Sequence, residues 1–197
     1  TKVKNNILKI YNLTTEEERF DWYQDANDYA EELSWLGVFT NTEKEDGSAH
    51  RKACGVIAAL SPLKTWQQNK KIAYDLIETG EAGHIKQFVD KANKIIDCDG
   101  SDEAILAILN GRKITSFYLN IMYPHKAEFV TIDRHALSIA LGCWTSEKDY
   151  AGMTANQYNF FVQCFTLAAM KADISPVLMQ SSTWVRWRKI KKEFKRR

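Results

Sequence analysis

The chain has no run of about 18 consecutive apolar residues, the length that a helix needs to cross a bilayer, so no membrane span is predicted. Its N-terminus also lacks the basic-then-apolar order that marks a secretory signal. Only nine glycines and three prolines occur in 197 residues. Turns use these residues most, so their scarcity disfavours a fold of many short β-strands.

Cysteine is scarce too, and its spacing argues against the common metal sites. The four cysteines stand far apart, and no Cys-x-x-Cys pair or Cys/His cluster occurs: Cys54, Cys98, Cys143 and Cys164. We therefore expect no zinc, no iron–sulfur cluster and no other cofactor. A reducing compartment is the simplest assumption, which predicts a cytoplasmic protein.

Charge is distributed unevenly along the chain. Residues 184–197 hold eight basic residues and one acid, Glu193, so this segment carries +7 against a total of +2. Residues 16–32 carry eight acids and only Arg19 as a base. A basic terminal helix suits a phosphate backbone, but a solvated tail has the same composition, and both interpretations stay open.

The hydrophobic periodicity and the capping residues predict an all-α protein. We expect a first helix from Thr14 or Thr15 to about Leu36, a loop over 41–48, and an apolar central helix over 49–60 that Ser61-Pro62 ends. Thr65 or Trp66 begins a third helix that runs to about Thr79, and further helices are predicted at about 84–96, 102–109, 112–122, 134–141 and 155–172. Ser175-Pro176 then starts the last helix, which places Gln180, Trp184, Trp187 and Arg188 on one face.

Three short segments carry residues suited to chemistry. They are Ala58 to Pro62 with Trp66 and Asn69; Leu109 to Lys113, opening a helix with Tyr118 and Asn120; and Val130 to Ala136. Gly111 before a helix lets a phosphate approach the free amides, with Arg112 and Lys113 beside it. Asp133 starts another helix twenty residues after Lys113. If the two helix starts converge, an amine and a carboxylate can face one cleft.

Each of these residues also has a purely structural interpretation. Asp133 is a good N-cap, Lys113 can be a solvated lysine, and His135 can be packed or exposed without binding anything. Arg134 can pair with an acid as well as with a phosphate. Trp66 and Trp184 are residues that cores use more often than base-stacking sites do. Taken singly, none of them indicates a function.

Taken in order, the segments resemble the helix–hairpin–helix DNA glycosylase superfamily of the endonuclease III type. There a hairpin reading LPGVGRK opens a helix, as Gly111-Arg112-Lys113 does here, and a VDTH-like segment follows, similar to Ile132-Asp133-Arg134-His135. The end of the apolar helix, Ala59-Leu60-Ser61, is similar to that family's LLSAQ segment. These matches cover about residues 53–142.

A wider pattern resembles a divergent, phage-encoded group of such proteins and spans nearly the whole chain. It comprises Trp22-Tyr23 with Ala26-Asn27, Ala59 to Pro62 with Trp66 and Asn69, Gly111 and Lys113 with Phe117-Tyr118 and Asn120-Ile121, Ile132-Asp133 with His135-Ala136, and Gln180 with Thr183-Trp184 and Trp187-Arg188. If the chain is phage-encoded as well, its compartment is the host cytoplasm.

The resemblance implies two helical lobes with a central cleft into which a base is flipped. One lobe would be 49–130, and the other 1–48 plus 131–197. Asp133 would stabilise positive charge on the sugar, and Lys113 would attack the sugar carbon and form a Schiff base. The residues expected to bind substrate or DNA are Gly111, Arg112, Arg134, His135, Ser61, Trp66, Asn69, Tyr118, Asn120, Gln180, Trp184 and Arg188. The expected protein is a monomer with DNA, duplex or single-stranded, as its partner.

This chain departs from the family pattern at three places. Leu109 stands where the hairpin has its first glycine, which should impair close approach to a DNA phosphate. Leu63 stands where the LLSAQ segment has its wedge glutamine. The C-terminal four-cysteine cluster is absent, as it is in some family members.

Three hypotheses about function follow. The first is a DNA N-glycosylase, with or without abasic-site lyase activity, acting on a modified or damaged base. The second is a phage base-hypermodification enzyme on the same scaffold, which replaces a pyrophosphate on the methyl group of a pyrimidine with an amine. The third is a DNA-binding module without catalysis. Fold-level analogy supports all three and cannot choose among them, but the retained pair of Asp133 and Lys113 favours the first.

Overall fold

The computed structural model describes residues 1–40, 46–126 and 129–195, and every regular element in these ranges is helical. By contacts the chain divides into two compact units. Unit 1 comprises residues 1–23 and 124–197, and unit 2 comprises residues 24–123. The all-α prediction is thereby confirmed, and each unit is described separately below.

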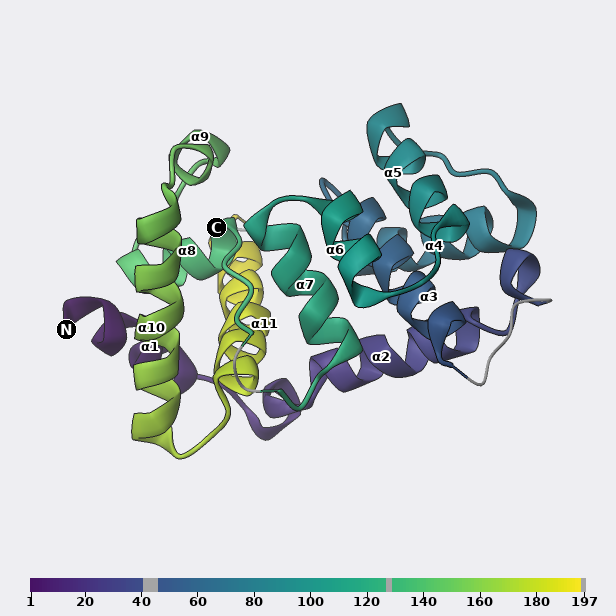
Figure 1. Cartoon of the computed structure of the whole chain (residues 1–197). Coiled ribbons are helices and arrows are strands. Elements are labelled where there is room, and N and C mark those ends of the chain that lie inside the picture. The colour runs from purple at the N-terminus through teal and green to yellow at the C-terminus, as the bar shows by residue number, and fades with distance from the viewer. Residues whose placement is uncertain (41–45, 127–128, 196–197) are drawn as a thin grey trace. The chain divides into compact units, whose positions relative to one another are not determined.

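Unit 1 contains α1 (Lys2–Tyr11), the 3-10 helix η1 (Glu16–Arg19), α8 (Arg134–Leu141), α9 (Glu147–Ala151), α10 (Ala155–Ala172) and α11 (Pro176–Lys195). Four of these helices, α1, α8, α10 and α11, pack against one another and share a core (Figure 1). Their buried side chains include Ile7, Ile139, Phe165 and Met179, each of them 0% exposed. Burial of this apolar surface is the main force that holds the helices together.

Unit 2 is built around α3 (Ser48–Leu60), which contacts α4 (Trp66–Thr79), α5 (Lys86–Asp97), α6 (Asp102–Leu109) and α7 (Arg112–Met122) (Figure 1). Residues 53–60 of α3 are all buried, as expected for a central helix without a polar face. Gly55 allows the close packing: a Cβ there would lie 2.9 Å from Ile95 and 3.0 Å from Ile105. The short η2 (Gly37–Phe39) packs on α4.

The predicted helix bounds at 66–79, 102–109, 112–122, 134–141 and 155–172 are confirmed. α3 begins at Ser48, one residue before the prediction, and α5 spans Lys86–Asp97 rather than 84–96. Two helices, α1 and α9, were not predicted. Residues 41–45 of the predicted loop lie outside the described residues.

The single helix predicted from Thr14 or Thr15 to Leu36 is wrong, because the chain breaks it at Phe20. The first part is η1, and α2 (Trp22–Leu33) starts afterwards. Glu18 turns back to accept a hydrogen bond from the Thr15 amide at 3.1 Å, and its side chain is only 1% exposed. Phe20 then adopts an extended backbone, with φ −71° and ψ 157°. A buried contact of Glu18 therefore overrides the local helix propensity.

The contact-based division differs in its bounds from the predicted lobes, 49–130 and 1–48 plus 131–197. Residues 24–48 belong to unit 2, and residues 124–130 belong to unit 1. Side chains such as Leu33 and Phe39 are 1% exposed, and η2 contacts α4, so this segment packs with the middle of the chain. In unit 1, Val130 is 2% exposed and belongs to the core around α1, α8, α10 and α11.

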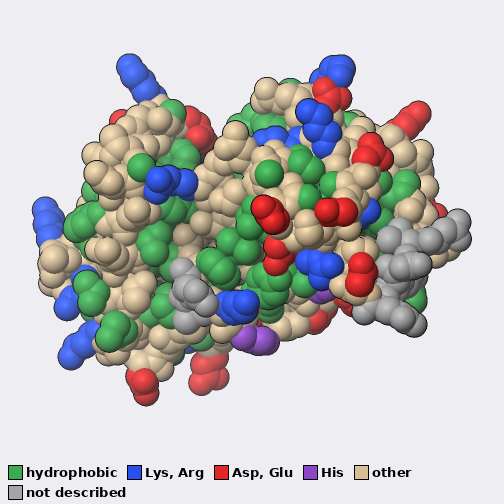
Figure 2. Space-filling view, in the orientation of Figure 1, with side chains coloured by type: hydrophobic (Ala, Val, Ile, Leu, Met, Phe, Trp, Pro, Cys, Tyr) green, Lys and Arg blue, Asp and Glu red, His purple; other side chains and the backbone are tan. Residues whose placement is uncertain are grey.

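Figure 2 shows side chains of every type on one face of the molecule, with hydrophobic groups among them over α10. On this helix Phe160, Leu167 and Met170 are 44%, 49% and 71% exposed. Within the described part of the chain, no single helix is long and apolar enough to cross a membrane. The four cysteines are free thiols.

Candidate functional site

Asp133 is the N-cap of α8, with an extended backbone at φ −100° and ψ −177°. Its Oδ1 accepts a hydrogen bond from the Ala136 amide at 2.7 Å, which satisfies one of the free amides at the helix start. Its Oδ2 accepts a second hydrogen bond, from the indole N–H of Trp184 on α11, at 2.9 Å. Two donors from different helices therefore fix the orientation of this half-buried carboxylate.

Two tyrosines hold the segment that leads into Asp133. The hydroxyl of Tyr158 on α10 accepts a hydrogen bond from the Ile132 amide at 3.1 Å. The hydroxyl of Tyr150 on α9 donates to the Ile132 carbonyl at 2.8 Å. Both backbone groups of Ile132 are thus satisfied by side chains, which makes the approach to α8 rigid. Neither tyrosine was predicted as a site residue, because nothing in the local sequence distinguishes them from ordinary helix residues.

Aromatic and cationic groups surround the Trp184 ring. Its centroid lies 5.9 Å from that of Trp22 and 6.3 Å from that of His135, and the guanidinium carbon of Arg188 lies 4.5 Å above it. Burial lowers the pKa of His135, and the nearby Arg134, Lys191 and Arg188 act in the same direction against the opposing charge of Asp133. His135 is therefore a neutral ring at pH 7. Arg134 itself pairs with Glu147 at 3.2 Å.

Gln180 lies in the interior of unit 1 and is only 4% exposed. Its Oε1 accepts a hydrogen bond from the Tyr23 hydroxyl at 2.9 Å. Burial raises the pKa of Tyr23, and the charge of Asp133 raises it further, so the phenol stays protonated and remains a donor. In this structure Gln180 therefore positions Tyr23 rather than presenting its amide to solvent.

The turn between α6 and α7 in unit 2 carries the other predicted group of residues. Asn110 has φ 42° and Gly111 has φ 119°, so both adopt positive φ, and for Gly111 a side chain would be strained. Arg112 is exposed and Lys113 is half-buried. The Lys91 ammonium donates to the Leu109 carbonyl at 2.5 Å, which satisfies the end of α6. This two-residue turn connects α6 to α7 and precedes the first turn of α7.

The remaining predicted residues of unit 2 have structural contacts. The Ser61 hydroxyl donates to the Ala58 carbonyl at 2.9 Å at the end of α3. Asn69 is 2% exposed and its amide donates to the Ile57 carbonyl at 3.1 Å, which ties α4 to α3. The Trp66 ring packs edge-on to Tyr29 at 6.2 Å, with the Lys70 ammonium 5.7 Å from its centroid.

A carboxylate joins both ends of the α6–α7 hairpin. Asp102, the first residue of α6, accepts hydrogen bonds from the hydroxyls of Tyr118 on α7 and Tyr123 just after it. Burial, with the hydrogen bond to Asp102, raises the pKa of Tyr123 to about 12, and it raises the pKa of Tyr118 as well. Tyr118 and Asn120 are both 0% exposed. Both residues therefore stabilise the hairpin from inside unit 2.

The basic segment of α11 is not a uniform solvated tail. Lys189 and Arg186 approach the buried Glu18 carboxylate at 2.8 Å and 3.7 Å. Two of the predicted phosphate-binding cations are thus committed to an internal ion pair. This contact joins α11 to η1 and explains why η1 is held where the sequence favours a continuous helix.

Replacing Glu18 by Gln should lower stability near pH 6 by about 1–2 kcal/mol, because the carboxylate is buried while Lys189 is half-exposed. Burial alone would raise the pKa of Glu18, but the hydrogen bonds from Lys189 and Thr15 and the charge of Arg186 hold it below 4.5. The stabilisation is therefore complete above about pH 4.5 and lost as pH falls through the folded-state pKa. Thermal midpoints between about pH 3 and 6 should show a flatter acid limb for E18Q than for the exposed control E17Q. Parallel acid limbs would contradict this prediction.

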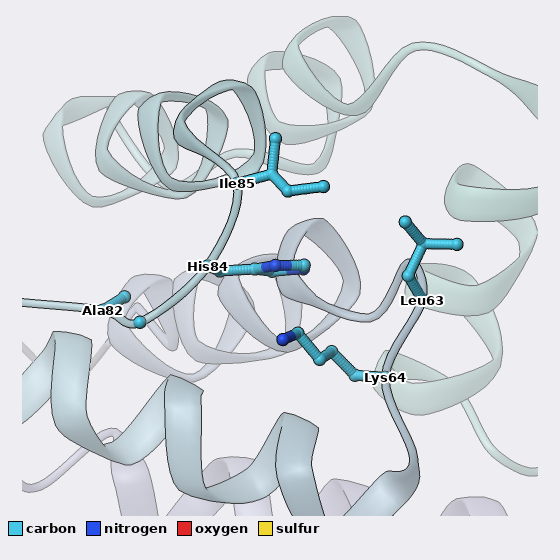
Figure 3. Close-up of a pocket in the computed structure, with 6 residues that line it drawn as sticks. Leu63, Lys64, Ala82, His84 and Ile85 are labelled. Atoms are coloured by element: carbon cyan, nitrogen blue, oxygen red, sulfur yellow. The ribbon is translucent and has the colours of Figure 1, made fainter.

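A hollow of about 530 Å³ lies in unit 2, lined by Leu63, Lys64, Ala82, Gly83, His84 and Ile85. Figure 3 shows the His84 ring between Ile85 and Lys64. A His84 ring nitrogen lies 3.1 Å from the Pro62 carbonyl, and burial followed by the charge of Lys64 lowers the pKa of His84. Leu63 has φ 63° and is 74% exposed. This hollow contains none of the residues that the sequence predicted as a site.

Asp133 provides a carboxylate in a fixed orientation, with aromatic rings and the Arg188 guanidinium nearby. Among the described residues, no group of three or more His, Cys, Asp or Glu is placed to hold a metal ion. Asp133, Trp184, His135, Arg188 and Gln180 come together in unit 1, whereas Lys113 and the other residues of the second group lie in unit 2.

Comparison with known proteins gives a family and no activity. No curated protein and no solved structure matches the chain significantly. One family model matches residues 1–191, nearly the whole sequence, and its description is a family of unknown function, DUF7178. The chain therefore belongs to the DUF7178 family.

Proposed function

We propose that the protein is a DNA N-glycosylase with abasic-site lyase activity. The observation that carries the proposal is the Asp133 carboxylate, fixed by the Ala136 amide and the Trp184 indole at the start of α8. A carboxylate held in place before the reaction can stabilise the positive charge that develops on a deoxyribose as its base leaves. This is the role that the resemblance to the helix–hairpin–helix glycosylases implies for Asp133.

The groups around Asp133 suit a nucleotide. A base offers a flat π-face, and the Trp184 and Trp22 rings offer surfaces of the same kind. A phosphate needs cations, and Arg188 lies over the Trp184 ring. His135 is neutral and can donate or accept a hydrogen bond without adding charge.

Lys113 is the proposed nucleophile. Its uncharged amine forms a bond to C1′ of the deoxyribose while the bond from C1′ to the base breaks, and the leaving base takes the electron pair and then a proton. Opening of the sugar ring gives a Schiff base between Lys113 and C1′, which allows elimination of the 3′ phosphate. Asn110 and Gly111, both with positive φ, form the turn that precedes α7. The amides in the first turn of α7, next to Lys113, have no partner within the helix and therefore favour a phosphate.

Borohydride reduction tests this proposal directly, because it converts the Schiff base into a stable amine. We expect wild-type protein to give a covalent adduct on DNA that contains an abasic site, uracil or hydroxymethyluracil. K113Q should give none, while K94Q, which changes an exposed lysine on α5 of the same unit, should still form it. No adduct on any of these substrates would remove the lyase activity from the proposal.

A non-catalytic DNA-binding module is the second candidate, and one observation favours it. Both oxygens of Asp133 already have protein donors, as expected for a residue that only caps α8 and anchors Trp184. In that case D133N would leave DNA binding intact, and neither wild-type protein nor D133N would release a base.

The hypermodification reaction would leave the glycosidic bond intact and change the base itself. Mass analysis of the bases after incubation of the protein and DNA with amine donors would reveal it.

A further inference from the structure

An exposed tryptophan is held in place on the loop that follows α8. Trp144 is 46% exposed. The next residue, Thr145, is tied to α8 by three hydrogen bonds: its amide donates to the Ser138 hydroxyl at 3.1 Å, its hydroxyl donates to the Arg134 carbonyl at 3.1 Å, and the Ser138 and Thr145 hydroxyls lie 2.6 Å apart. These hydrogen bonds fix the loop. The Trp144 ring nevertheless stays partly in solvent, which is unfavourable because apolar surface is left exposed to water.

The Trp144 ring rests on a second tryptophan. Its centroid lies 4.2 Å from that of Trp187 on α11, with an angle of 42° between the ring planes. Trp187 is 7% exposed, so it supports Trp144 from the interior of unit 1. Its buried indole N–H has no acceptor among the described residues, which is uncommon for a buried donor. The pair joins the loop after α8 to α11, and α8 and α11 themselves contact each other (Figure 1).

Cations of α11 lie beside this tryptophan pair. The Lys191 ammonium is 5.5 Å from the Trp144 centroid, and Lys192 is exposed at the next position. One turn earlier, Arg188 lies over Trp184, the residue that binds Asp133. Arg186 and Lys189, on the same helix, pair with Glu18.

We propose that Trp144, backed by Trp187 and flanked by Lys191, is a stacking platform for a base of single-stranded DNA. An exposed aromatic ring binds any base through its π-face, and an adjacent cation neutralises the phosphate of the same nucleotide. Trp184 and Lys191 are seven residues apart on α11, about 10 Å along the helix axis. The platform therefore binds a nucleotide that flanks the one at Asp133. The choice of DNA rests on the proposed function, whereas the platform itself requires binding and no bond cleavage.

Trp35 provides a matched control. It is 56% exposed, more than Trp144, but its indole N–H donates to the Glu31 carboxylate at 3.2 Å. A phosphate is repelled by such an acid, so an exposed ring in this setting does not attract DNA. Comparison of the two tryptophans separates a specific platform from a general effect of removing a large exposed side chain.

The test measures fluorescence anisotropy of a labelled 15-nucleotide thymidine oligomer, which has no base for the enzyme to release. W144A should raise the Kd at least about fivefold, the lower end of the range for one base–aromatic stack. W144F keeps a ring and should recover most of the affinity, and W35A should change the Kd less than about twofold. K191Q should reduce the slope of log K against log salt by about 0.7, as expected for one phosphate contact on a single strand.

Two results would overturn the platform. One is an unchanged Kd for W144A. The other is an equal loss for W144A and W144F, which would show that the aromatic ring is not the binding element. A larger effect of W144A on duplex than on the oligomer would exclude the single-strand assignment. The effect of W144A on the Kd should be the same in the D133N background as in wild type, so a failure of catalysis and a failure of the platform give different results.

Discussion

Replacing Asp133 by Asn should lower the rate of base release by about 100- to 1,000-fold, the usual cost of removing one preorganised electrostatic group from an active site. The amide removes the negative charge that would face the cationic sugar. It does not remove the helix cap, because Asn caps helices as well as Asp does and can still accept from the Ala136 amide. Single-turnover release of the base, measured on the substrate that gives the borohydride adduct, checks the rate.

Two further variants and a stability measurement separate this charge effect from a loss of structure. D149N changes another carboxylate that caps a helix in unit 1, since Asp149 accepts from the Ser146 amide at 2.7 Å, and it should keep the wild-type rate. W184F removes the indole donor and keeps the Asp133 charge, so it should retain more than about a tenth of the rate. D133N loses the acceptor of the Trp184 indole just as W184F loses the donor, so the thermal midpoints of the two variants should be alike. Equal rates for D133N and wild type would assign Asp133 to helix capping alone.

Replacing Asp102 by Ala should destabilise unit 2 by about 3–5 kcal/mol, the largest stability effect that we expect. The carboxylate accepts from the Tyr118 and Tyr123 hydroxyls, and a hydrogen bond to a charged group contributes about 1.5–3 kcal/mol. Without it, the Tyr118 hydroxyl is left in the interior, because this side chain is 0% exposed. Denaturant unfolding followed by circular dichroism measures the change.

A multiple-mutant cycle identifies the cause of that loss. D102A combined with Y118F and Y123F removes the donors together with the acceptor, so it should be more stable than D102A alone. E103A, at the exposed neighbouring position on α6, should leave the unfolding midpoint nearly unchanged. If the triple variant is as unstable as the sum of its parts, the carboxylate does not act through these hydroxyls.

The sequence predicted elements where local chemistry alone decides the structure. The Thr154 cap and the helical spacing after it fixed the start of α10, and Ser175-Pro176 marked the start of α11. The apolar stretch before Ser61 identified α3 as the central helix, and the Asp133 cap was visible in its position before an apolar segment. These features depend on residues within one or two turns of each other, so the pattern of side chains is sufficient.

Only the tertiary structure decided the contacts between distant segments. Trp184 binds Asp133 from 51 residues away, and Tyr158 reaches back 26 residues to Ile132. Glu18 is buried by cations of α11, and this contact breaks the helix that the local sequence favours. Local sequence determines which residues can form a helix and cap it. Which side chains meet across helices depends on how the apolar faces pack, and this is decided by the whole chain at once.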